Sequence, residues 1–164
     1  MTRPTQRWRQ TLLAAMIAVG SPLADADFDS GNNAYRAQAW GEAFDEWQHC
    51  ANQGVAACQY GLGVLYDEGR SVDADLYTAL NWYERAARHG HADAMMQLGF
   101  LYATGRGDIV QNAILAWVWF ARAASKGAKR GTEYRDRVGA LLSIKELAEA
   151  QRKADSLSIE YHQQ

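Results

Sequence analysis

The sequence predicts an all-α fold in which helical hairpins stack into an α/α solenoid. The main observation is an internal repeat, because residues 55–90 align with residues 91–127 with one added residue in the second copy. The aligned positions share glycines, leucines and aromatic residues, among them Leu62/Leu98, Gly63/Gly99, Tyr66/Tyr102, Trp82/Trp119 and Gly90/Gly127. Self-similarity with a period of about 36 residues is typical of solenoids. The 164-residue chain has only two prolines, which favours uninterrupted helices.

Residues 1–26 have the features of a secretory signal peptide. Three arginines precede a short apolar run at 12–19, and Ala24 and Ala26 stand where a signal peptidase reads small residues. The run is shorter than the ~20 residues that span a bilayer, so a retained membrane helix is the less favoured alternative. We expect cleavage after Ala26 and a periplasmic or secreted protein that does not insert into a membrane.

The composition is that of a globular protein, with 48% hydrophobic residues and a net charge of −2. Without residues 1–26 the chain carries 14 basic and 18 acidic side chains, a net charge of −4. Such a balance provides no extended basic field for nucleic acid. We therefore expect no binding to nucleic acid. We also expect a monomer.

The two cysteines, Cys50 and Cys58, both lie in the expected mature chain. In an exported protein an isolated pair without Cys-x-x-Cys spacing favours a disulfide over a metal or redox site. The alternative is two reduced cysteines in alanine-like core positions.

Residues 27–54 are a shorter, degenerate copy of the repeat. Ala43, Trp47 and Cys50 occupy positions that correspond to Ala79, Tyr83 and Ala86. We predict an upstream helix over 28–36 and interpret this copy as an N-terminal capping hairpin, since terminal repeats have one face in water.

Each full copy predicts two helices. In the first, apolar spacing predicts a helix over 56–68 that ends at Gly69, and Asp75 is the expected N-cap of a second helix to about residue 89. In the second copy, Gly105 and Asn112 take the same two roles. The added residue falls in the loop between them, where it leaves the helix faces in register.

Residues 128–164 form the expected C-terminal capping hairpin, a degenerate copy like the N-terminal one. A charged helix is predicted over 128–138. Ser143 and Glu146 form a capping box that begins a final helix to about residue 161.

The repeat residues resemble the Sel-one-like repeat (SLR) family, which is related to tetratricopeptide repeats. The resemblance covers residues 27–157 and departs from the pattern at 38–40, where Gln-Ala-Trp replaces the usual Gly-Asp-Tyr and weakens the cap of the first hairpin. It rests on these residues of the first copy: Leu62, Gly63, Leu65, Tyr66, Gly69, Arg70, Asp75, Ala79, Trp82, Tyr83, Ala86, Ala87 and Gly90. The family implies stacked antiparallel helix pairs and an adaptor role in protein complexes, in signalling or in envelope assembly. Its cysteine-rich branch has pairs with seven residues between the cysteines that link neighbouring helices, which implies a Cys50–Cys58 disulfide.

No catalytic or metal-binding motif occurs in the sequence, and we expect neither an enzyme nor a cofactor. His89 and His91 lie on the turn between the copies without a third ligand nearby, so we interpret them as turn residues rather than as a metal site. Some cysteine-rich relatives are linked to β-lactam binding, which makes a β-lactam-acting enzyme the alternative function. The chain has neither Ser-x-x-Lys nor Lys-Thr-Gly, so that chemistry has no evident nucleophile.

A protein or peptide partner is the remaining expectation. If the first helix of each repeat lines a concave groove, the positions off the core stripe are Tyr60, Val64, Asp67, Met96, Phe100 and Ala103. Five of these six are apolar, which suits a partner helix or peptide. The alternative is that the cap helices cover them. A basic cluster at Lys126, Lys129 and Arg130 is either a solvated face or a docking site for an acidic partner.

Overall fold

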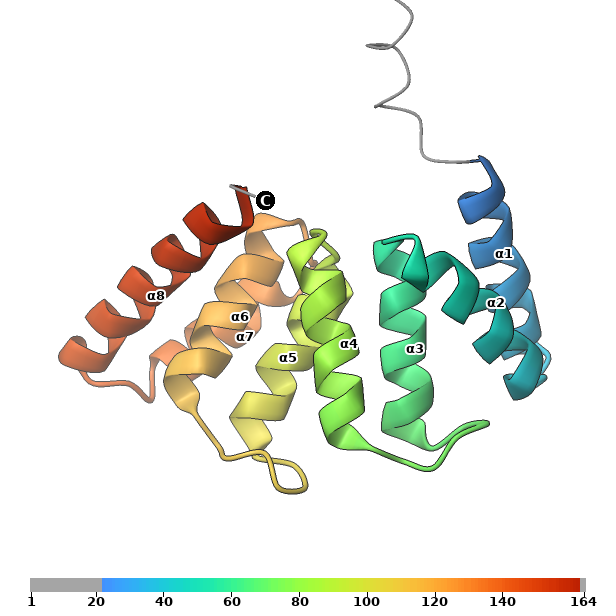
Figure 1. The fold of residues 1–164 in the computed structure, drawn as a ribbon. Coiled ribbons are helices and arrows are strands. Elements are labelled where there is room, and N and C mark those ends of the chain that lie inside the picture. The colour runs from blue at the N-terminus through green and yellow to red at the C-terminus, as the bar shows by residue number, and fades with distance from the viewer. Residues whose placement is uncertain (1–21, 163–164) are drawn as a thin grey trace, which may run out of the picture.

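The computed structural model describes residues 22–162, which form eight α-helices and no strand (Figure 1). The first six pair as successive hairpins that lie side by side, which confirms the helical-repeat solenoid. The helices are α1 (Pro22–Arg36), α2 (Trp40–Asn52), α3 (Ala56–Glu68), α4 (Leu76–Arg88), α5 (Ala92–Thr104), α6 (Ala113–Ser125), α7 (Gly131–Gly139) and α8 (Ile144–His162). Residues 1–21 of the expected signal peptide lie outside the described residues. Helix α1 begins at Pro22 rather than at Phe28, so the expected cleavage point falls within it.

The predicted helix ends of the two full repeats are confirmed. Helices α3 and α5 end at Gly69 and Gly105, with φ angles of 66° and 64° that suit glycine. The Asp75 side chain accepts hydrogen bonds from the amides of Tyr77 and Thr78 and begins α4. Asn112 accepts from the Leu115 amide and begins α6.

The repeated glycines make room for aromatic rings of the neighbouring helix. A Cβ atom added at Gly63 would lie 2.5 Å from the ring of Tyr83 in α4, and one at Gly99 would lie 2.6 Å from Phe120 in α6. Trp47 of α2 lies similarly between Gly31 and Gly61, at 2.5 Å from each added Cβ. Helices that pack this closely leave no room for a larger residue, which explains why Gly63 and Gly99 occur at the same position of the two repeats.

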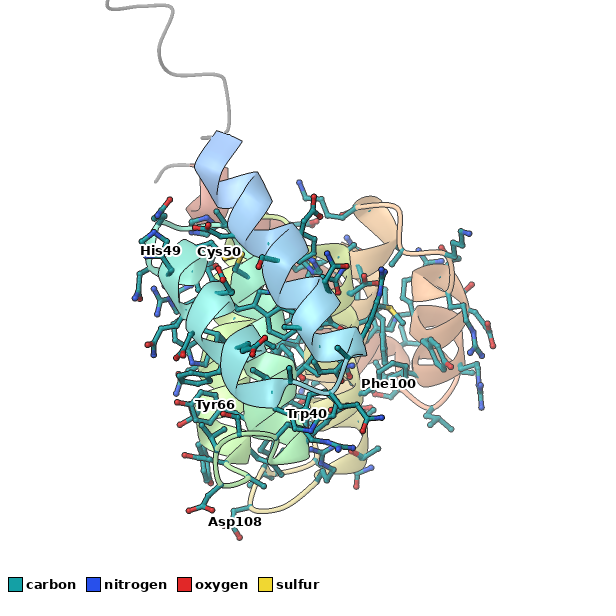
Figure 2. All side chains as sticks on the ribbon, turned by 90° about the vertical axis from the view of Figure 1, so that its right-hand side faces the viewer. Trp40, His49, Cys50, Tyr66, Phe100 and Asp108 are labelled. Carbon is teal, nitrogen blue, oxygen red and sulfur yellow. A yellow bond between two sulfur atoms is a disulfide. The ribbon has the colours of Figure 1, made fainter. Side chains whose placement is uncertain are left out.

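A disulfide between Cys50 and Cys58 joins the capping hairpin to the first repeat. The two Cα atoms are 5.9 Å apart, and both side chains are buried between α2 and α3. It lies near the end of α2 that carries His49 (Figure 2). The pairing implied by the cysteine-rich branch of the family is therefore confirmed.

The two caps are less regular than the repeats. Gln38 adopts a φ of 60° where the family has glycine, and Ala39 begins α2 without a side-chain hydrogen bond. At the other end, the capping box is confirmed, since the Ser143 hydroxyl accepts from the Glu146 amide and the Ser143 amide donates to the Glu146 carboxylate. Helices α7 and α8 both pack on α6 rather than forming a tight hairpin with each other.

Candidate functional site

Two adjoining pockets lie along the face formed by the first helix of each pair. The first, which we call the N-terminal pocket, has a volume of about 300 Å³ and lies between α1, α2, α3 and α5. The second, the C-terminal pocket, has a volume of about 570 Å³ and lies between α3, α5 and α7. Tyr60 and Gln97 line both pockets, so the two form one continuous groove.

Four of the six residues predicted for the groove line these pockets. Tyr60 lines both, Val64 lines the N-terminal pocket, and Met96 and Phe100 line the C-terminal pocket. Asp67 and Ala103 line neither. All six are half-buried.

Phe100 is partly covered by the C-terminal cap. Its ring centroid lies 5.1 Å from that of Phe120 and 4.7 Å from that of Tyr134 on α7, both in edge-to-face contact. Figure 2 shows Phe100 on the opposite side of the molecule from His49, which is on the second helix of its pair. At Phe100, a cap helix therefore covers a predicted groove residue in part.

Asp67 takes part in contacts within the solenoid. Its carboxylate accepts a hydrogen bond from the Tyr83 hydroxyl at 3.1 Å and forms an ion pair with Arg106 of the next repeat. Only 12% of the Asp67 side chain is exposed. These contacts join the two helices of one repeat to the loop of the next, so the carboxylate has a structural role.

Tyr60 lines both pockets and is held by a ring contact. Its ring stacks on His91 with centroids 4.7 Å apart and an interplanar angle of 18°. The His91 imidazole is half-buried, and its Nδ1 accepts a hydrogen bond from the Ala94 amide at the start of α5. Burial lowers the pKa of His91, which favours the neutral ring that this contact requires. His91 is thus a helix-capping residue as well as a turn residue.

Helix α1 contributes a wall of the N-terminal pocket that was not predicted from the sequence. Phe28, Asn32 and Tyr35 line the N-terminal pocket. The Tyr35 hydroxyl donates to the Glu68 carboxylate at 2.8 Å, and burial together with this hydrogen bond raises the pKa of Tyr35 to about 12. The groove was predicted from the first helix of each full repeat. The same rule applied to the degenerate copy predicts these residues, since α1 takes the place of α3 and α5. Tyr134 lines the C-terminal pocket because α7, the first helix of the C-terminal cap, takes the corresponding place at the other end.

The described part of the chain shows neither a metal cluster nor a membrane span. Between residues 22 and 162, no three His, Cys, Asp or Glu side chains are placed to hold a metal ion. None of the helices in this range is long and apolar enough to cross a bilayer.

Stacked antiparallel helix pairs with a groove along one face define a helical-repeat protein. The family model described as "Sel1 repeat" matches residues 56–91 and 92–127. Residues 56–127 therefore hold two Sel1 repeats, and the solved structures below share the SLR fold of the chain.

Two solved structures share this fold. A protective antigen of uropathogenic Escherichia coli with an SLR fold is 30% identical at a TM-score of 0.73, and the match covers 84% of this chain and 29% of that chain. A Sel1 repeat protein from Oxalobacter formigenes is 29% identical at a TM-score of 0.61, and the match covers 70% of this chain and 88% of that chain.

A curated relative is the chitin synthase regulator SKT5 of Saccharomyces cerevisiae. It is 33% identical over 101 residues, which are 60% of this chain and 14% of the yeast protein. The chain thus spans a small part of the curated relatives it matches.

Proposed function

We propose that the chain is a non-catalytic adaptor of the bacterial cell envelope that binds a segment of a partner protein in the groove. The observation that carries the proposal is the groove itself, a half-buried surface of aromatic, methionine and valine side chains shared by two repeats. Tyr60, Val64 and Met96 offer apolar contacts from two parallel helices. Such a surface suits a peptide or helix whose apolar side chains recur along one face.

Two features support the envelope location. The leader at 1–26 has the charge and hydropathy pattern of a signal peptide. The Cys50–Cys58 disulfide is of a kind that persists in oxidising compartments such as the periplasm. A bacterial alkaline phosphatase fusion at the C-terminus tests the location, since the enzyme is active only after export. Loss of phosphatase activity in a stable fusion would contradict it.

One curated relative is consistent with action through another protein, since the yeast relative is named as a regulator of chitin synthase. By analogy, we expect this chain to act by contact with its partner.

Site-specific photo-crosslinking in the native bacterium tests the groove. A photoreactive amino acid at Met96 should give a discrete adduct with a partner protein, because this side chain lines the C-terminal pocket. The matched control is the same amino acid at Val110, which is 81% exposed in the loop before α6. Adducts from Val110 alone, or the same adducts from both positions, would overturn the assignment.

A further inference from the structure

The two pockets of the groove differ in their charged lining residues: basic side chains occur only in the C-terminal pocket, and the N-terminal pocket has a single carboxylate. In the N-terminal pocket, Glu68 is the one charged residue of the lining, which also has four aromatic residues: Phe28, Tyr35, Trp47 and Tyr60. The Glu68 side chain is 42% exposed. One of its oxygens accepts from Tyr35 and lies 3.7 Å from Arg70, which is outside the pocket lining. Aromatic faces and a carboxylate both attract a cation.

The C-terminal pocket is lined by Lys129 and Arg130 from the turn before α7. Arg130 donates to the Glu133 carboxylate at 3.1 Å, so its charge is partly balanced. Among the described residues, Lys129 lies within ion-pair distance of no carboxylate. Asp93 also lines this pocket, in the first turn of α5, where the helix dipole stabilises its charge. Lys126 carries a further positive charge at the same turn.

We propose that the bound partner segment carries a lysine or arginine that enters the N-terminal pocket and an aspartate or glutamate that reaches Lys129. This inference rests on the proposed function, since it specifies the partner of the same groove. Because Tyr60 and Gln97 are shared by both pockets, the two charged residues lie close together in the partner, with an apolar residue between them over Tyr60 and Met96. Complementary charges of this kind set specificity and orientation more than affinity.

Selection from a phage-displayed library of random linear peptides against the purified full chain tests the proposal. Peptides that bind should share a basic and an acidic residue in one order around an apolar residue. A synthetic peptide from this selection should bind the Glu68→Lys variant and the Lys129→Glu variant about ten-fold more weakly than the wild type. Selection against Glu68→Lys should replace the basic residue of the peptides by an acidic one.

Matched controls are available on α8. Glu149 is 43% exposed and lies 3.7 Å from Lys153, so Glu149→Lys changes the same charge in a similar setting away from the groove. Lys145→Glu is the corresponding control for Lys129→Glu. Both controls should bind the peptide as the wild type does, and circular dichroism should show that all four variants fold.

The outcomes separate this inference from the proposed function. Peptides that lose binding with Met96→Glu, but show no ordered charge pair and no effect of Glu68→Lys, would overturn the charge inference and leave groove binding intact. Binding that is unaffected by Met96→Glu would overturn both. Equal weakening by the α8 controls would also overturn the charge inference, since it would reflect net charge alone.

Discussion

The Tyr83 hydroxyl donates a hydrogen bond to the Asp67 carboxylate at 3.1 Å, and the second repeat lacks both polar groups together. At the aligned positions that repeat has Phe120 and Ala103. The two copies therefore differ in a matched way, a polar pair in one and an apolar pair in the other. A residue that differs between copies thus has a structural explanation here, rather than a binding role.

This pair predicts non-additive effects on stability. Tyr83→Phe should lower the free energy of unfolding by about 1 kcal/mol. Asp67→Ala should lower it by about 1–3 kcal/mol, because it leaves a buried hydroxyl without its acceptor. The double variant reproduces the apolar pair of the second repeat, so its cost should be smaller than the sum by about 1 kcal/mol. Urea unfolding of the four proteins measures this coupling. Strictly additive costs would show that the hydrogen bond contributes nothing.

The close contact at Gly63 makes a second prediction. Gly63→Ala should destabilise the protein by about 1–3 kcal/mol, since the added Cβ would lie 2.5 Å from the Tyr83 ring. Gly41→Ala is the control, because a Cβ at this α2 position meets nothing within 4 Å and should stabilise the helix by up to about 1 kcal/mol. Thermal melts of both variants measure the difference. The idea fails if both alanines stabilise the protein equally.

One substitution, Gln38→Gly, should stabilise the N-terminal capping hairpin. Gln38 has a φ of 60°, which costs a side-chain-bearing residue about 1–2 kcal/mol. Gln38→Gly should therefore raise the free energy of unfolding by ~0.5–1 kcal/mol after the entropy of the more flexible unfolded chain is included. Gln53→Gly is the control, because Gln53 has a φ of −82° at the end of α2. A Gln38→Gly protein that melts below the wild type would contradict the prediction.

Helix boundaries and caps were predictable because they depend on residues close together in the sequence. Gly69, Asp75, Gly105 and Asn112 act within one turn of their own positions. The contact of Asp67 with Tyr83 was not predictable, since it depends on how α3 and α4 are oriented where they pack together. The α1 wall of the N-terminal pocket was missed because the first copy has lost most of the residues that mark the repeat. The C-terminal cap was expected to be a hairpin, and the separation of α7 from α8 was missed because residues 128–164 have also lost the residues that mark the repeat.

His91 should make stability depend on pH. Its pKa in the folded protein lies below the ordinary value of 6.5 because the ring is buried, so the neutral form favours folding. This contribution is complete above pH 6.5 and is lost as the pH falls through the lowered pKa. His91→Asn keeps a capping oxygen without titrating, so its stability should fall less than that of the wild type between about pH 7.5 and pH 5. The exposed neighbour gives the control, His89→Asn. Identical pH profiles for His91→Asn and wild type would contradict this role.

Titration calorimetry with the partner found by crosslinking at Met96 shows whether the groove is the binding site. Met96→Glu should weaken binding at least about ten-fold, because a carboxylate then replaces an apolar contact in the C-terminal pocket. Val110→Glu introduces the same charge at an exposed loop position and should bind as the wild type does. Equal affinity of wild type and a folded Met96→Glu protein would contradict the claim that the groove is the binding site.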